Sequence, residues 1–287
     1  MRVSRRTAGS AALSAVLALT AALALAAGSN AAKAPPAPPP PPGPPLYPNV
    51  VEEVPHHLGI QNAQQREWLR FSTTHINLGP GNLQIRGGGQ VAPCTIDGVA
   101  YEQCTVATQE LLDSSGRIVM THPAGVSLFH PEHNHWHQSD VAEFKIMRGD
   151  PVTGTAVAAG VKITFCFVDV EFTGMTGAEK KPYPRTYFEC NGTLQGLAAG
   201  WADSYHQSTP LQELDVTDLR EGDYYLTHEA DPDNHWMEGP SATSTGEQDN
   251  FTWVKFHLDR STGANPSITV LANSPCTGVQ CGFGGNP

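Results

Sequence analysis

Short runs rich in β-branched and aromatic residues recur from residue 68 onward, and clusters of Gly, Pro, Asn and Asp separate them. Such runs are typical of β-strands, and the clusters between them are typical of turns. Apolar spacing that would indicate long amphipathic helices is missing. The pattern predicts an all-β fold, an antiparallel β-sandwich with long loops and little helix. The predicted strands are Trp68–Leu78, Leu83–Arg86, Ile118–Thr121, His135–Met147, Val161–Val170, Tyr224–His228, Thr252–Leu258 and Ser267–Leu271.

The N-terminal segment has a different pattern. Arg2, Arg5 and Arg6 precede an uncharged apolar stretch from Ala8 to Ala27, which is typical of a secretory signal peptide. We therefore expect residues 1–32 to be a signal peptide. A membrane anchor is the alternative, because about twenty apolar residues can span a bilayer. Cleavage is favoured over a stable anchor since the stretch is rich in Ala, Ser and Gly, and the arginine pair also resembles a twin-arginine export signal.

Composition divides the rest of the chain into a spacer and a domain. Residues 33–48 are Pro-rich and predict an extended linker, whereas residues 49–287 have a globular composition and suffice for one β domain. The formal charge is −11, and it becomes −14 without residues 1–32 because that segment carries three arginines and no acidic residue. An acidic exported protein repels nucleic acid and attracts cationic substrates. We therefore expect no nucleic-acid partner.

Six cysteines in an exported chain suggest three disulfides. Two pairs are close in sequence and are separated by turn-like or short loop segments, which leaves the remaining two cysteines for each other. Fifteen pairings are possible, and sequence does not prove one of them. The pairing we choose is Cys94–Cys104, Cys166–Cys190 and Cys276–Cys281.

Histidines are concentrated between residues 130 and 137, where His133, His135 and His137 alternate with other residues. Alternation is the period of a β-strand, so we expect the three imidazoles to leave one face of one strand and to hold a metal ion. Imidazole ligands favour copper or zinc over calcium or magnesium, and the spacing does not separate copper from zinc. The alternative is a surface histidine cluster, which the large apolar residues Trp136 and Phe144 make less favourable.

Four segments, in order, resemble the lysyl oxidases, copper amine oxidases whose quinone cofactor is built from their own side chains. The histidine segment followed by Glu143-Phe144 is similar to the family's copper-binding segment, and Lys162 to Asp169 is similar to its lysine-bearing strand. The other two segments are Cys190 to Gly200, which leads to Asp203-Ser204-Tyr205, and Leu214 to Tyr224. The resemblance covers about residues 68–260.

The resemblance implies a role for each matching residue. His133, His135 and His137 would ligate copper, with His130 orienting a ligand. Lys162 and Tyr205 would be joined as lysine tyrosylquinone. Asp169 and Asp203 are the two candidates for the catalytic base. The implied reaction uses dioxygen to oxidise peptidyl lysine or small primary amines to aldehydes, with release of hydrogen peroxide and ammonia.

The chain also departs from the family's pattern. Animal lysyl oxidases carry a cysteine between their first histidines, and it bonds to the cysteine that matches Cys190. This chain has Pro131 and Glu132 in that interval, so Cys190 needs another partner, which supports its pairing with Cys166. Trp201 replaces the cysteine before the quinone loop. These differences, together with the export signal, indicate a bacterial member that acts outside the cell.

Two other classes of protein fit the histidines. One is a non-catalytic secreted copper-binding β-sandwich protein that stores or delivers the metal. The other is a zinc hydrolase, in which three histidines leave one position open for a metal-bound water. The sequence lacks a clearly placed acidic partner for such a water, so the hydrolase is the weaker alternative.

Overall fold

The computed structural model describes residues 41–160, 163–173, 185–239, 249–261, 263 and 266–282. In this part of the chain every strand pairing is antiparallel and no α-helix is found, which confirms the predicted all-β class. A 3-10 turn, η2 (Gly278–Cys281), lies near its end. No helix of the described residues is long and apolar enough to cross a membrane. The smaller sheet contains β1 (Val50–Glu52), β2 (His56–Ala63), β3 (Arg66–Asn77), β10 (Glu171–Phe172), β12 (Trp201–Tyr205) and β13 (Glu213–Asp215).

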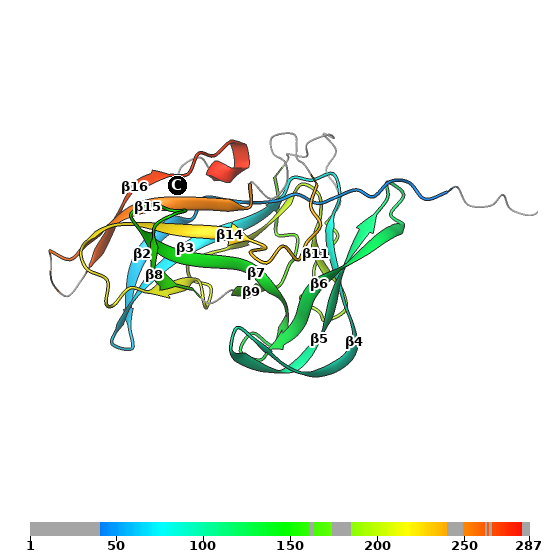
Figure 1. Cartoon of the computed structure of the whole chain (residues 1–287), viewed down its shortest axis with the longest axis horizontal. Helices are drawn as coiled ribbons and strands as arrows, with labels where there is room; N and C mark the ends of the chain where they lie inside the picture. The colour runs from blue at the N-terminus through cyan, green and yellow to red at the C-terminus, as the bar shows by residue number, and fades with distance from the viewer. Residues whose placement is uncertain are drawn as a thin grey trace, which may run out of the picture. The chain divides into compact units, whose positions relative to one another are not determined.

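The larger sheet has ten strands and follows the order β11-β4-β5-β6-β7-β14-β15-β16, with β8 and β9 paired to β7 (Figure 1). Its central strand β7 therefore has neighbours from distant parts of the sequence. The strands are β4 (Leu83–Ile96), β5 (Val99–Leu112), β6 (Ile118–His130), β7 (His135–Arg148), β8 (Thr155–Ala159), β9 (Ile163–Phe165), β11 (Gln195–Leu197), β14 (Gly222–Ala230), β15 (Phe251–Asp259) and β16 (Ser267–Asn273).

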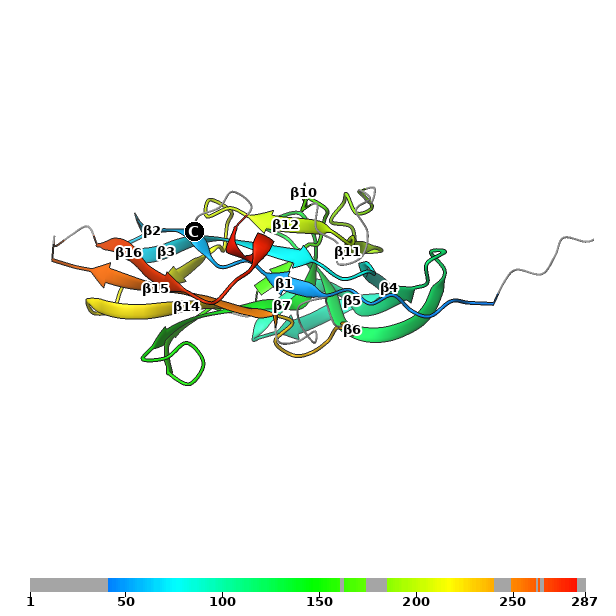
Figure 2. The same cartoon turned by 90° about the horizontal axis from the view of Figure 1, so that it is seen from above.

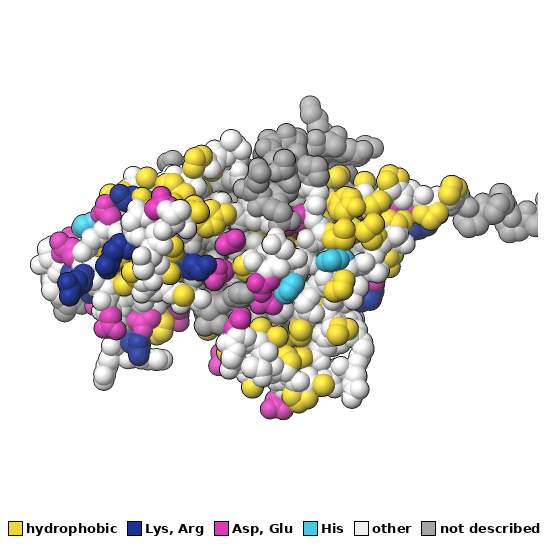
Figure 3. Space-filling view, in the orientation of Figure 1, with side chains coloured by type: hydrophobic (Ala, Val, Ile, Leu, Met, Phe, Trp, Pro, Cys, Tyr) yellow, Lys and Arg dark blue, Asp and Glu magenta, His cyan; other side chains and the backbone are white. Residues whose placement is uncertain are grey.

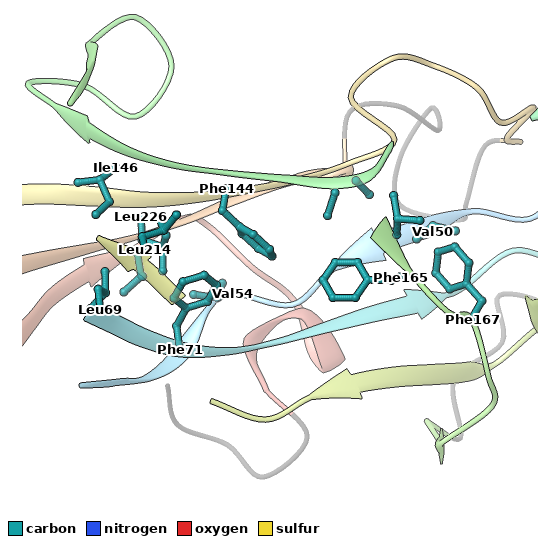
Figure 4. Packing of buried hydrophobic residues seen from close by; sticks show 14 of the residues in the cluster. Val50, Val54, Leu69, Phe71, Phe144, Ile146, Phe165, Phe167, Leu214 and Leu226 are labelled. Carbon is teal, nitrogen blue, oxygen red and sulfur yellow. The ribbon is translucent and has the colours of Figure 1, made fainter. Parts of the chain in front are cut away.

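The two sheets pack face to face, with β3 and β12 in one layer and β7 and β14 in the other (Figure 2). Strand β15 shows why the layers form, because its residues alternate between buried and partly exposed along the whole strand, the period that gives a sheet one apolar face. The rings of Phe71 on β3 and Phe144 on β7 meet between the layers with centroids 4.9 Å apart (Figure 4). The core is therefore a sandwich interior.

The predicted strand Val161–Val170 is wrong beyond Phe165, since Ile163–Phe165 is the part that forms a strand among the described residues 163–170, and residues 161 and 162 lie outside them. At Phe167 and Val168 the backbone donors bond to side chains instead of a neighbouring strand. The backbone N–H of Phe167 donates to Gln195 Oε1, and that of Val168 donates to Asp203 Oδ2. An apolar run alone does not reveal this, because the acceptors come from distant residues.

The N-terminal border of the domain also differs from the expected one. The signal segment lies outside the described residues, as does the linker up to residue 40. Farther on, Leu46 N donates to Leu112 O at 2.8 Å, and Tyr47 O accepts from Gly81 N at 3.0 Å. The last residues of the expected linker are thus attached to the β domain, because a Pro-rich segment can still use its non-proline backbone groups.

Three disulfides are present, and they are the pairs chosen from the sequence. Cys94–Cys104 joins β4 to β5, and Cys276–Cys281 closes a loop near η2. Cys166–Cys190 ties the segment after β9 to the loop before β11. The Cys166–Cys190 bond thus holds together two segments that border the histidines.

Candidate metal centre

Three imidazoles meet where β6 turns into β7. His135 and His137 lie on β7, but His133 lies in the turn before it, where Asn134 has a φ of 55°. The prediction that all three leave one strand is therefore wrong for His133, because a left-handed residue interrupts the extended backbone. The turn still brings the rings together. His137 Nε2 lies 3.2 Å from His133 Nδ1 and 2.9 Å from His135 Nε2.

The histidine triad (His133, His135 and His137) fits a transition metal. One nitrogen of each ring lies within 4.8 Å of the other two. Burial lowers the pKa of all three imidazoles, and that of His137 falls to about 2 because the neighbouring histidines add to the burial. Neutral rings with converging nitrogens are the donors that copper and zinc prefer.

Two neighbouring side chains orient these rings. Thr164 Oγ1 on β9 lies 2.9 Å from His137 Nδ1, which leaves the Nε2 atom of that ring directed toward the other histidines. His130 stacks on His133, with ring centroids 4.2 Å apart. Such contacts fix the angle of a ligand ring. Sequence reasoning missed Thr164, whose only signal is its place in the same predicted strand as Lys162.

A cavity of about 370 Å³ joins the triad to β12. Asp203 and Tyr205 open into it from β12, and Thr164, Phe165 and Cys166 border it. Lys162 lies outside the described residues. The cavity therefore brings together the histidines and two of the other predicted site residues, although they are separated by more than sixty positions in the sequence.

Tyr205 and Asp203 form a hydrogen-bonded pair inside the cavity. The Tyr205 hydroxyl lies 3.1 Å from Asp203 Oδ2 and also contacts the carbonyl oxygen of Cys166. Burial raises the pKa of Asp203 to about 7, although His75 and the backbone N–H of Val168 favour its charged form. Burial and the Asp203 carboxylate together hold the pKa of Tyr205 well above its usual range. The pKa of the Asp203 carboxyl group is thus well above the usual range of an aspartate.

Asp169 has a different environment. Its carboxylate accepts hydrogen bonds from the backbone N–H groups of Thr186, Tyr187 and Ala198, at 2.7, 3.0 and 2.8 Å. It is fully buried and is not among the residues that border the cavity. The arrangement favours a role for Asp169 in holding three loop segments together.

A second groove, of about 500 Å³, continues from the cavity, because Thr164 and Leu211 line both. Trp68 and Tyr101 give it aromatic walls, and the exposed Glu132 lies at its edge. On the face drawn in Figure 3, Asp and Glu side chains are widely spread, whereas Lys and Arg gather mainly toward the end that carries β2, β8 and β16. Glu132 therefore places one exposed carboxylate at the groove.

Comparison with known proteins gives one family. Residues 116–245 match the family model described as lysyl oxidase. Human lysyl oxidase homolog 1 is 31% identical over 105 residues, which are 36% of this chain and 17% of that protein. Pig protein-lysine 6-oxidase is 30% identical over 105 residues, 38% of its length, and zebrafish lysyl oxidase homolog 2B is 33% identical over 99 residues, 12% of its length.

The matched part therefore spans well under half of each of these relatives. The segment 116–245 that matches the family model includes the whole histidine triad as well as Asp203 and Tyr205. Part of the chain is thus similar to the lysyl oxidase family, and the cavity described above is built from that part.

Proposed function

We propose that this protein is a copper-dependent oxidase of primary amines, with peptidyl lysine as its main substrate class. The products would be an aldehyde, hydrogen peroxide and ammonia, formed from the amine, dioxygen and water. The observation that carries the proposal is the shared cavity, in which three neutral imidazoles and the half-buried Tyr205 face the same space.

The triad would hold copper, and Lys162 and Tyr205 would be the precursors of the quinone. When bound, copper and dioxygen would oxidise the Tyr205 ring for addition of the Lys162 nitrogen, and the resulting lysine tyrosylquinone would accept two electrons from the amine. Phe165 packs against Tyr205 with ring centroids 4.4 Å apart, which fixes the ring plane and limits the access of water to that side.

Asp203 would act as the base that removes the α-proton of the bound amine. Its carboxyl group accepts a hydrogen bond from the Tyr205 hydroxyl and has a pKa of about 7, so both of its protonation states are accessible under physiological conditions. Asp169 lacks this position because its oxygens are occupied by backbone donors.

We expect kcat/KM to rise with pH through about 7 and then to level off. The protonated Asp203 predominates below pH 7 and cannot accept a proton, so the rate should fall about tenfold per pH unit on the acid side. Asp203→Asn should lower turnover by about 10²- to 10⁴-fold. Amine oxidation would be followed by peroxide release in buffers of constant ionic strength.

Asp169→Asn is the matched control for that experiment. An amide cannot accept hydrogen bonds at both positions, so the variant should lose about 1–3 kcal/mol of stability while its folded fraction keeps its turnover. A loss of turnover in folded Asp169→Asn, with little loss in Asp203→Asn, would reverse the assignment.

Thr164→Val should weaken copper binding by about 10- to 100-fold, because His137 would lose the contact that directs its Nε2 atom toward the other ligands. Valine keeps the branched shape and the strand preference of threonine. The measurement is copper affinity by competition with a chromophoric chelator. Unchanged affinity would show that Thr164 does not orient the ligand.

Glu132→Gln should raise KM for a lysine-rich peptide by about fivefold at low salt, since one nearby charge pair is worth about 1 kcal/mol in water. The effect should shrink above about 0.15 M salt. Glu102→Gln makes the same charge change at an exposed residue that does not line the groove. Equal effects of the two variants would mean that only the overall charge attracts the substrate.

Peroxide release from a lysine-rich peptide tests the function itself. We expect release by the copper-loaded protein and its suppression by a hydrazine, which reacts with carbonyl cofactors. A secreted copper carrier would release no peroxide with any amine, and a zinc hydrolase would not require dioxygen.

We also propose that the protein is exported and acts outside the cell. Three disulfides fit an oxidising compartment, and residues 1–32 have the composition of a signal peptide.

A further inference from the structure

A second group of ligand-type side chains lies in the core, on other residues than the histidine triad. Glu52 belongs to β1, His75 to β3 and His228 to β14, so the group includes residues of both sheets. All three side chains are fully buried, with exposed fractions of 0%. We refer to Glu52, His75 and His228 as the core cluster.

The strand pairing places these residues against one another. Glu52 and His75 are partners in the β1–β3 register, and Glu52 Oε1 lies 2.6 Å from His75 Nδ1. His228 approaches from the opposite sheet, with its Nε2 atom 3.0 Å from Glu52 Oε2. One donor atom from each residue lies within 4.8 Å of the other two.

Hydrogen bonding accounts for only part of the cluster. Among the described residues, Glu52 Oε2, His75 Nε2 and both nitrogens of His228 have no hydrogen-bond partner. The close approach of His228 Nε2 to Glu52 Oε2 is therefore not aligned as a hydrogen bond, and both atoms are left with unused lone pairs or protons. Fully buried polar atoms without partners are unfavourable, and a native core rarely keeps several in one place.

We propose that the core cluster binds a second metal ion, a divalent transition ion of the zinc class. Two imidazoles and a carboxylate are ligands that zinc accepts, whereas calcium and magnesium prefer oxygen. Both oxygens of Glu52 face an imidazole nitrogen, so a bidentate carboxylate would complete four coordination positions. The ion would satisfy the buried charge of Glu52 and the Nε2 atom of His228.

The surroundings make this ion structural. Phe144 stacks on His228 with centroids 4.7 Å apart, and Phe165 and Phe167 lie edge-on to His75 at 5.2 and 5.7 Å. These rings leave no exposed face on the cluster for a substrate. An ion bound there would link β1 and β3 of one sheet to β14 of the other, and binding would be coupled to folding.

The test uses the mature protein with all three histidines of the triad replaced by alanine, which leaves the core cluster intact. It would be unfolded in denaturant with a chelator, disulfides retained, and refolded with Zn²⁺ or without metal. We expect about one tightly held zinc per chain and a rise in melting temperature of roughly 5–10 °C at free Zn²⁺ about a hundredfold above Kd. A protein that refolds in the presence of Zn²⁺ but retains no zinc would overturn the proposal.

Adding Glu52→Gln to the triple-alanine variant should abolish zinc retention, and zinc retained by this folded quadruple variant would also overturn the assignment. If the quadruple variant does not fold, the ligands are identified instead by X-ray absorption of the triple-alanine variant refolded with Co²⁺. Two imidazoles and a carboxylate per cobalt are expected, whereas an all-oxygen shell, or any other number of imidazoles, would contradict the core cluster. Neither readout involves amine oxidation, so a failure here leaves the proposed function intact.

Discussion

Tyr205→Phe should abolish amine oxidation, with a loss of at least about 10³-fold, or about 4 kcal/mol in the activation barrier. Phenylalanine fills the same space against Phe165 but has no ring oxygen to start from, so no quinone can form. Copper binding should persist, because Tyr205 borders the cavity and is not one of the three convergent imidazoles. Peroxide release and copper content would be measured on the same sample.

Tyr187→Phe is the matched control. It removes another buried hydroxyl, one that bonds to Gln84 Oε1 at 2.8 Å and does not border the cavity. This variant should lose about 1 kcal/mol of stability and keep its turnover. Oxidation of amines by Tyr205→Phe at the wild-type rate would rule out Tyr205 as a cofactor precursor.

His135→Ala should remove both copper and turnover, the second large effect. Its Nε2 atom lies 2.9 Å from that of His137, and the remaining two imidazoles cannot hold the ion in the same way. Because copper is needed to make the quinone, the variant should also lack the visible absorbance of the cofactor. Metal analysis and the visible spectrum of the purified protein would show both losses.

His257→Ala serves as the control for the histidine change. His257 lies on β15 and pairs with Asp223 at 2.8 Å on the surface. It should keep copper, absorbance and turnover. Normal quinone absorbance in His135→Ala would contradict the proposed ligand set.

The sequence pattern predicted much of the fold, because the alternation of buried and exposed residues along a strand can be read from a few neighbouring positions. In β15 the buried residues Thr252, Val254 and Phe256 can be recognised from a short window, and the same holds for His135 and His137 on β7. The position of His133 could not be predicted in this way, since it depends on the left-handed conformation of Asn134 in the turn.

Contacts between distant segments were not accessible to the pattern. Thr164 meets His137 because β9 pairs with β7, and His75 meets Glu52 because β1 pairs with β3. No periodicity links these residues. The resemblance to lysyl oxidases supplied Lys162, Tyr205 and Asp203 from aligned segments, but it gave no indication of Glu52, His75 or His228.

The most direct test of the central claim is a search for a covalent link between Lys162 and Tyr205. The purified protein would be loaded with copper in air, its disulfides reduced, and its proteolytic peptides analysed by mass spectrometry beside a copper-free sample. We expect one joined peptide that contains both residues, present only after copper loading. Separate, unmodified Lys162 and Tyr205 peptides from copper-loaded protein that oxidises amines would contradict it.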